Sequence, residues 1–406
     1  MPENSIFAAL RFRDFRLLWF GLMVSNLGTW MQFTALGYFV AQIAGSPARA
    51  ALDLGIIGGA RAIPVLLLSP FAGVVADRFP RRRVLLATNV VMSLAALSLA
   101  ILSTLHRLDL GGVIAIAALN AAANAFDSPV RQSWTPMLVE RPFVGNAIGL
   151  TSVAFNAPAV IGPALAGILI VWVGVAGSFY VNAIATLAVV VAIAMMAPSP
   201  PTIARREPVL ASIHGGIRFL FEHPILRWII GVFVVTAIFV RPYAQLIPAF
   251  IVNTLRGGPQ ALGWAVAAAG IGGFAGALVT AAFPSHVPRS LQWVIAGGAM
   301  AAGVLALATI WSVAFTIPVF FFIGFGTLAF LGASNTLIQT LSPDEMRGRA
   351  VSVYTMIAVG VVPAGSLVLG TIASRIGLHA TFAIGGGIAL ALVIFAYAAH
   401  PVVRSV

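Results

Sequence analysis

The stretch that decides the fold is residues 73–83, which read GVVADRFPRRR. It begins with Gly73 and holds one acid, Asp77, and four arginines, in a chain of which 8% is charged. On either side lie apolar segments that are long enough to cross a bilayer. Because positively charged loops stay on the cytoplasmic side, the stretch predicts an inner turn between two membrane spans.

The composition predicts a membrane protein with many spans. Hydrophobic residues make up 60% of the 406 residues, which excludes a soluble domain. A helix needs ~20 apolar residues to cross ~30 Å of hydrocarbon, so the chain has room for about twelve spans. The first apolar segment is too long for a signal peptide and is expected to be a retained span. Since the chain has no cysteine, disulfides and thiolate metal sites are excluded.

The basic residues follow a membrane pattern. The net charge is +12, and all 23 basic residues are arginines. If the spans alternate across the membrane, most arginines lie on the inner side, which places both termini in the cytoplasm. The exceptions are Arg49, Arg107, Arg256 and Arg375 on the outer side, and Arg61 and Arg241 inside spans. We therefore expect a lipid bilayer around the chain and no nucleic-acid partner.

The apolar segments predict an all-α membrane protein with twelve transmembrane helices in two pseudo-symmetric six-helix halves. In chain order the segments are residues 17–43, 54–76, 84–105, 111–130, 144–173, 178–197, 226–252, 261–283, 291–310, 312–337, 350–374 and 378–399. We expect an amino-terminal half at residues 1–197, a cytoplasmic linker at 198–225 and a carboxy-terminal half at 226–406.

Two further patterns support this division. Gln132 and Pro136 recur 207 residues later as Gln339 and Pro343, and Gly167 recurs 203 residues later as Gly370. Such a repeat is a known transporter plan, with the binding site near the midplane. In the linker, apolar residues at 210, 213, 217, 220 and 221 share one helical face. This face indicates an amphipathic helix on the inner membrane surface, although an ordinary connecting helix also fits.

Arg241 is the strongest candidate for a functional charge, because it lies near the middle of the seventh span. A charge at that depth costs at least ~2.5 kcal/mol, so a carbonyl, an acid or a substrate should match it. The adjacent Pro242 can break the helix and free carbonyls, and Gln245 shares the face of Arg241. Arg61 lies nearer the outer end of its span and could instead snorkel. Two arginines without buried acids predict an anionic or zwitterionic cargo.

The fourth span carries a polar stripe of Asn120, Asn124, Asp127 and Arg131, at spacings that place all four on one face. Polar groups inside a membrane should face protein or a water-filled cavity. We expect Asp127 to be the only acid within or at the edge of a span. It could exchange protons, or it could pair with Arg131 in a structural latch.

Gln32 in the first span and Asn156 in the fifth are further cavity candidates, although amide side chains also serve helix contacts. Apart from His379, the second residue of the last segment, no histidine lies inside a span, and no metal-ligand cluster, Walker loop or nucleophile elbow occurs. We therefore expect no enzyme activity, no cofactor and no metal.

Residues 73–83 resemble the loop signature of the major facilitator superfamily of transporters. Gly73, the pair Asp77-Arg78 and the pair Arg81-Arg82 match it, and Pro80 stands where the family usually has glycine. The resemblance implies the major facilitator fold, and it implies that Asp77 latches this loop to the eleventh span when the cytoplasmic side is shut. Asp127 and Arg131 are expected to join that latch. A loop that only anchors topology also fits.

Several other stretches resemble one branch of the superfamily, the drug and siderophore exporters of the enterobactin-exporter and transmembrane secretion effector type. These are LGTWMQ at 27–32, DSPVRQ at 127–132 and SPDEMRGRA at 342–350. Gly162-Pro163 followed by Gly167 resembles the antiporter signature, with Pro158 in place of a glycine. The resemblance implies alternating access driven by a proton gradient.

These patterns predict a monomeric exporter of amphipathic small molecules, drug-like or siderophore-like with anions among them, that exchanges its cargo for protons. Its expected location is the bacterial inner membrane. Two other functions remain open. An uptake symporter for an organic anion fits the arginines equally well. A non-transporting receptor or scaffold would leave the polar stripes without a purpose.

Overall fold

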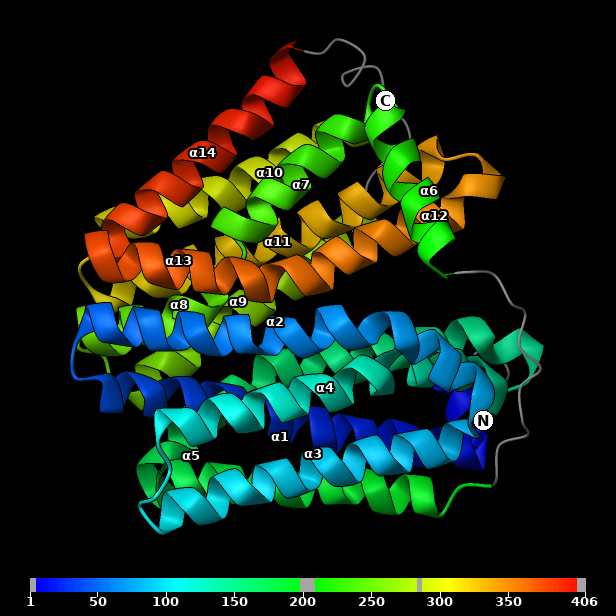
Figure 1. Cartoon of the computed structure of the whole chain (residues 1–406), viewed down its shortest axis with the longest axis horizontal. Helices are drawn as coiled ribbons and strands as arrows, with labels where there is room; N and C mark the ends of the chain where they lie inside the picture. The colour runs from blue at the N-terminus through cyan, green and yellow to red at the C-terminus, as the bar shows by residue number, and fades with distance from the viewer. Residues whose placement is uncertain (1–4, 198–208, 283–286, 400–406) are drawn as a thin grey trace. The chain divides into compact units, whose positions relative to one another are not determined.

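The computed structural model describes residues 5–197, 209–282 and 287–399 of the chain. Every regular element within these ranges is a helix, so the predicted all-α class is confirmed (Figure 1). Nine helical segments in the described part are long and apolar enough to cross a membrane. They are Pro47–Leu68, Arg81–Thr104, Leu110–Leu138, Arg141–Ala194, Leu226–Thr254, Pro259–Ala281, Arg289–Thr309, Val313–Leu341 and Leu378–Ala398.

The chain forms two compact units. Unit 1 comprises Met1–Phe39 and Ile63–Arg206, and unit 2 comprises Val40–Ala62 and Glu207–Val406. The helices of the amino-terminal part are η1 (Ala8–Arg11), α1 (Arg13–Ala44), α2 (Pro47–Arg78), α3 (Arg81–Thr104), α4 (Leu110–Trp134), η2 (Thr135–Leu138), η3 (Arg141–Phe143) and α5 (Val144–Ala194). Helices α1 and α2 therefore contribute residues to both units.

Unit 1 is organised around α3 and α5, with α3 packed against both α4 and α5. A buried cluster that includes Phe15, Trp19 and Trp134 joins α1, α4 and α5. Within it the indole Nε1 of Trp19 donates to the carbonyl of Leu150 at 2.7 Å, so the ring is held in both position and orientation. Helix α5 contains two of the predicted spans, because Gly174 interrupts it with a φ of 72°, a conformation that favours glycine.

The turn at residues 73–83 is shorter than the sequence predicts. Helix α2 continues to Arg78 and α3 begins at Arg81, so Phe79 and Pro80 alone lie between them. Pro80 has a φ of −56° and precedes the first residue of α3. Since proline has no N–H to donate, it fits at a helix start, where that donor would have no partner. The charged residues expected on a loop therefore lie mostly on helix ends.

The carboxy-terminal helices belong to unit 2. They are α6 (Val209–Glu222), α7 (Leu226–Phe239), α8 (Tyr243–Pro248), η4 (Ala249–Thr254), α9 (Pro259–Ala281), α10 (Arg289–Ala306), η5 (Leu307–Thr309), α11 (Val313–Leu341), α12 (Asp344–Met356), η6 (Ile357–Val361), α13 (Val362–Ile376) and α14 (Leu378–Ala399). Both η4 and η6 are π-helical. The linker residues 198–208 lie outside the described residues.

Close packing in unit 2 depends on glycine. Helix α11 lies against α9 and α10, and α10 lies against α14. A methyl group at Gly324 of α11 would overlap the carbonyl oxygen of Ala269 in α9, and Gly272 of α9 has the same relation to Phe321. Small residues let membrane helices approach each other at backbone distance, where van der Waals contact replaces the missing hydrophobic effect.

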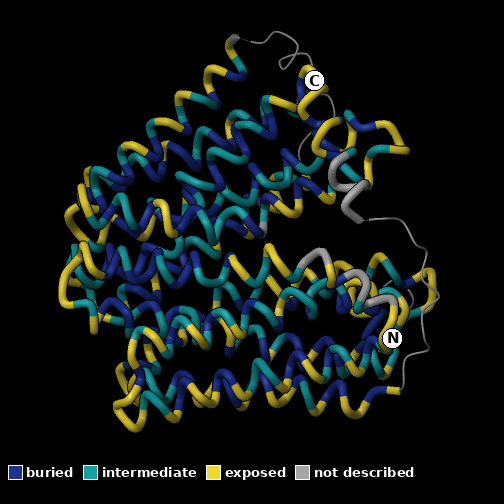
Figure 2. Tube along the Cα trace, in the orientation of Figure 1, coloured by how far each residue is buried: buried dark blue, intermediate teal, exposed yellow. Residues whose placement is uncertain are grey.

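The outward faces of these helices are apolar, as a bilayer requires. Along α14, Ile384, Ile388 and Phe395 are exposed, whereas Ala389 and Val393 are buried, and Figure 2 shows this alternation turn by turn. Such an exposed apolar stripe would be a liability in water. In a membrane it faces lipid tails.

Helix α6 shows where the linker helix meets the rest of unit 2. It packs against α12, with Gly216 close to the backbone of Arg349. Leu220 is buried there, whereas Ile217 and Phe221 are exposed. The side chains of Leu210 and Ile213, predicted on the same apolar face, lie outside the described residues.

Replacing Gly324 by alanine is expected to destabilise the protein, because the added methyl group meets the backbone of α9 and the helices must separate. Overpacking of this kind costs about 1–3 kcal/mol. Gly298→Ala is the matched control, since a methyl group at Gly298 meets nothing within 4 Å. Thermal unfolding in detergent should show a lower melting temperature for the Gly324 variant alone. Equal melting temperatures would contradict the packing role of Gly324.

Candidate functional site

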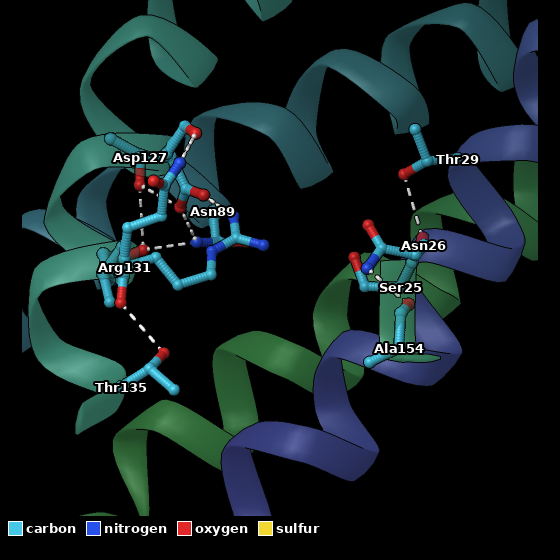
Figure 3. A network of polar contacts seen from close by, with 12 residues as sticks. Ser25, Asn26, Thr29, Asn89, Asp127, Arg131, Thr135 and Ala154 are labelled. Carbon is cyan, nitrogen blue, oxygen red and sulfur yellow. Dashed lines mark hydrogen bonds and ion pairs between the residues drawn. The ribbon is translucent and has the colours of Figure 1, made fainter. Parts of the chain in front are cut away.

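The centre of the polar stripe on α4 is Asp127, whose side chain is fully buried. The carboxylate accepts hydrogen bonds from Thr88 Oγ1 at 3.0 Å and from Asn89 Nδ2 at 2.6 Å, both on α3. It also forms an ion pair with Arg131, one turn further along α4 (Figure 3). The charge of Asp127 is therefore neutralised within its own helix and held by donors from a neighbouring one.

Arg131 links this cluster to other parts of unit 1. Its guanidinium carbon lies 5.5 Å from the centre of the Phe155 ring on α5, a cation–π distance. Its carbonyl accepts a hydrogen bond from Thr135 Oγ1 at 3.0 Å. The arginine is almost fully buried. Asp127 and Arg131 therefore neutralise each other's charge in a region of low dielectric constant. The pairing that the four-residue spacing suggests is thus present, and Thr88 and Asn89 are partners that the sequence analysis missed.

The basic residues at the start of α3 bind structural groups in unit 1. Arg81 is buried, and its Nε donates to Ser133 Oγ at 3.2 Å. Arg82 donates to the carbonyls of Ile193 and Ala194, the last residues of α5. A cation there satisfies carbonyls that the helix leaves free and complements its negative end.

The other residues of the predicted latch are less defined. Arg78 ends α2 and is exposed. Gly73 and Asp77 belong to α2, but the surroundings of Gly73 and the side chain of Asp77 lie outside what the structure describes. The expected contact of Asp77 with the eleventh span stays a prediction.

Arg241 lies at a break between two helices of unit 2. Helix α7 ends at Phe239 and α8 starts at Tyr243, and the backbone N–H of Arg241 donates to the carbonyl of Thr236 at 2.8 Å, a wide turn. The break follows from Pro242, which cannot continue the helical hydrogen bonding. Its effect is to hold an arginine side chain in the middle of a membrane span.

The guanidinium of Arg241 is matched by a carbonyl, one of the partners that its depth predicts. Nη2 donates to the carbonyl of Ala358 at 3.2 Å, in the π-helix η6. The guanidinium carbon lies 5.6 Å from the centre of the Phe233 ring. Nη1 is buried and has no hydrogen-bond partner among the described residues. One donor face of a charged group is thus available for an acceptor.

The remaining cavity candidates have few contacts. Among the described residues, no hydrogen bond or ion pair involves the side chains of Arg61, Asn120, Asn124 and Gln245, and Asn124 is exposed. The amide of Asn156 donates to the carbonyl of Ser152 on its own helix at 2.8 Å. Local satisfaction of this kind fits a helix contact as well as a binding site.

Gln32 has a partner that the sequence analysis did not single out. Its Oε1 accepts a hydrogen bond of 2.6 Å from Asn182 Nδ2, on the second part of α5. Asn182 is buried, and Thr186 Oγ1 lies 3.4 Å from its Oδ1. Nearby, Asn26 Nδ2 donates to the carbonyl of Ala154, also seen in Figure 3. Amides on α1 therefore tie it to both parts of α5.

The expectation that Asp127 is the only acid in or beside a span is wrong. The span at α2 begins at Pro47, so Asp53 lies inside it, and the residue is buried at 3% exposure. Arg49 pairs with it, with Nε 3.0 Å from Oδ1. The missed signal was Ser46-Pro47, since Ser46 caps the helix through a 3.3 Å bond from the N–H of Arg49. A capping serine followed by proline marks a helix start.

The chain is similar to known transporters over nearly its whole length. A family model described as transmembrane secretion effector matches residues 4–405. The multidrug efflux pump Tap of Mycolicibacterium fortuitum is 28% identical over 377 residues, covering 90% of each chain. The enterobactin exporter EntS of Citrobacter koseri is 24% identical, covering 92% of this chain and 88% of its own.

Solved structures agree with this result at the level of the fold. A POT family transporter in complex with 5-aminolevulinic acid has a TM-score of 0.76 at 12% identity, covering 99% of both chains. A bacterial homologue of the lysosomal transporter Spinster has a TM-score of 0.69 at 15% identity, covering 97% of this chain and 96% of its own. The match to the family model confirms the resemblance to the major facilitator superfamily that residues 73–83 indicated. The chain belongs to the transmembrane secretion effector family of the major facilitator superfamily, and it is a multi-pass membrane transporter and not an enzyme.

Proposed function

We propose that this transporter exports amphipathic small molecules by alternating access, in exchange for protons. Support comes from full-length relatives that are named for multidrug efflux and for export of the siderophore enterobactin. The observation that carries the choice of cargo is the buried Nη1 of Arg241, a charged donor without a protein acceptor among the described residues. An anionic oxygen is the partner that would satisfy it best.

We propose twelve spans in two related halves, at residues 1–197 and 226–406, joined by the linker at 198–225. The nine long apolar segments include α5, which Gly174 divides, while α1 and the α12–α13 segment would supply the remaining spans. Both termini would then lie in the cytoplasm, and a bacterial inner membrane fits the bacterial relatives. We also propose that the transporter acts as a monomer.

Equivalent contacts in the two units support a repeat. Gln132 donates to Ser128 at 3.1 Å, and Gln339 donates to Asn335 at 3.1 Å, 207 residues later. Close approach recurs as well, because Gly162 faces the backbone of α1 and Gly365 faces the backbone of α7, 203 residues later. Duplicated halves would produce contacts at these intervals.

For Asp127 and Arg131 we propose a structural latch. Two donors from α3 and one ion-pair partner occupy the carboxylate of Asp127, so releasing it for proton exchange would leave several buried groups unpaired. Exchange of protons at Asp127 is the alternative.

Export is tested with inverted membrane vesicles that contain the protein and hold an acidic interior. The expected result is accumulation of ethidium or of an amphipathic carboxylate such as salicylate, which stops when the proton gradient is dissipated. Vesicles that lack the protein are the control. Uptake that requires an acidic exterior would favour the symporter, and absence of any flux for a panel of such probes would contradict the proposed function.

Arg241→Ala is expected to lower affinity for the carboxylate probe by about thirtyfold, because a charge-assisted hydrogen bond contributes about 2 kcal/mol. Transport of the cationic probe ethidium should change little. Arg227→Ala, an exposed arginine at the start of the same span, is the matched control. Unchanged affinity for the carboxylate, or equal losses for both probes, would refute an anion-binding role. Competition assays in proteoliposomes measure both.

Asp127→Ala is expected to lower the free energy of unfolding by about 3 kcal/mol, since it leaves Arg131 buried without its partner. Asp127→Asn should still accumulate cargo against a concentration gradient when a proton gradient is imposed. Glu140→Gln, which removes an exposed carboxylate 3.4 Å from Arg11, is the control. If Asp127→Asn abolished accumulation but preserved cargo exchange, Asp127 would be the proton carrier and the latch assignment would be wrong.

A further inference from the structure

Two acids are buried among the side chains that the structure describes, Asp53 and Asp127. Each forms an ion pair with an arginine four residues away on its own helix, and in each pair the arginine lies toward the nearer end of the span. Arg131 lies toward the end of α4, and Arg49 lies toward the start of α2. In the proposed orientation these ends are the inner and outer sides of the membrane.

The two carboxylates differ in how firmly they are held. Asp127 has two hydrogen-bond donors from α3 besides Arg131, and Arg131 is itself buried. Among the described residues Asp53 pairs with Arg49 alone, and the side chain of Arg49 is 61% exposed. Protonation of Asp53 would therefore free one guanidinium that already reaches water. Protonation of Asp127 would leave a buried arginine unpaired.

The depth of Asp53 also suits contact with outer water. It lies six residues after the start of the span at Pro47, or about 9 Å at the helical rise. Asp127 lies 17 residues after Leu110, or about 25 Å from the same side. Protons that drive export must be taken from outer water, so their first acceptor has to be reachable from that side.

We propose that Asp53 takes up the driving proton on the outer side, and that Arg49 is the counter-ion released when it does. The proton comes from outer water and binds one carboxylate oxygen, and the guanidinium of Arg49 then turns to solvent. When alternation opens the inner side, the carboxyl group returns the proton to water there and pairs again with Arg49. This inference rests on the proposed antiport, for which it names the proton-binding residue.

Few other charges lie near Asp53. On its own helix, Arg61 falls two turns further along the same face. Helix α13 packs against this part of α2, where Gly55 and Gly58 meet Ser366, and its one charged residue, Arg375, is exposed. Residues 40–44 at the end of α1 carry no charge. Arg49 is thus the charged group that Asp53 releases when it binds a proton.

The decisive experiment separates gradient-driven accumulation from exchange in proteoliposomes, with ethidium as the probe. Asp53→Asn should exchange internal for external ethidium at a rate close to wild type, because exchange needs no net proton movement. It should lose accumulation driven by a proton gradient, which amounts to about tenfold per pH unit for each proton coupled. Asp109→Asn, an exposed aspartate at the outer start of α4, is the matched control. Accumulation equal to wild type in Asp53→Asn would overturn the inference.

Arg49→Gln provides a second test, because it removes the positive charge and keeps the carboxyl group of Asp53. Since its positive charge favours the ionised carboxylate, removing it should shift the outer-pH dependence of accumulation to higher pH. An unchanged profile would overturn the role of Arg49 as counter-ion. If Asp53→Asn lost exchange as well as accumulation, the outer-pH dependence of accumulation in Arg49→Gln would decide whether Asp53 binds the driving proton.

A third readout does not depend on transport. Infrared spectra of the protein in membranes should show a protonated carboxyl band at low pH that is missing in Asp53→Asn and retained in Asp109→Asn. A wild-type protein with this band but without flux of any probe would refute the proposed export and leave the proton site standing. Flux driven by protons together with an unchanged band in Asp53→Asn would refute the proton site alone.

Discussion

A charge inside the hydrocarbon region must face a partner in the protein or a water-filled cavity, because lipid tails cannot satisfy it. This constraint decides where the chain can keep its few buried ions. Asp127 is matched by Arg131, Asp53 by Arg49, and Arg241 by the carbonyl of Ala358. Two of these solutions use an ion pair within one helix. The third needs a broken helix and a π-helical turn, because a regular helix leaves no carbonyl free in its middle.

Each unit cross-links two of its own helices through a buried polar contact. In unit 1, Asp127 on α4 is held by donors from α3. In unit 2, the position 207 residues later is Ser334 on α11, and it accepts a 3.0 Å hydrogen bond from Trp293 Nε1 on α10. Both contacts are buried, so each cross-links two neighbouring helices. A neutral hydroxyl does this in unit 2, and a carboxylate does it in unit 1.

Glycine and proline determine much of the rest. Glycines bring α9 and α11 to backbone contact, and Gly174 separates two predicted spans inside α5. Pro80 allows α3 to start almost directly after α2, and Pro242 breaks the helix at Arg241. Where these residues act through their own backbone, their effect could be predicted locally. Where they act by close approach, it depended on which helix lies opposite.

The sequence by itself determined the helical class, the family and the approximate positions of most apolar segments, and it offered the pairing of Asp127 with Arg131 as one of two interpretations, because hydropathy and helical spacing are local properties. It also singled out Arg241, whose depth can be counted along one span. Only the tertiary structure decided that Thr88 and Asn89 hold Asp127, that Asn182 binds Gln32, and that Ala358 receives Arg241. These partners come from other helices, far away in the chain, and no periodicity within one helix specifies which residue of another will face it.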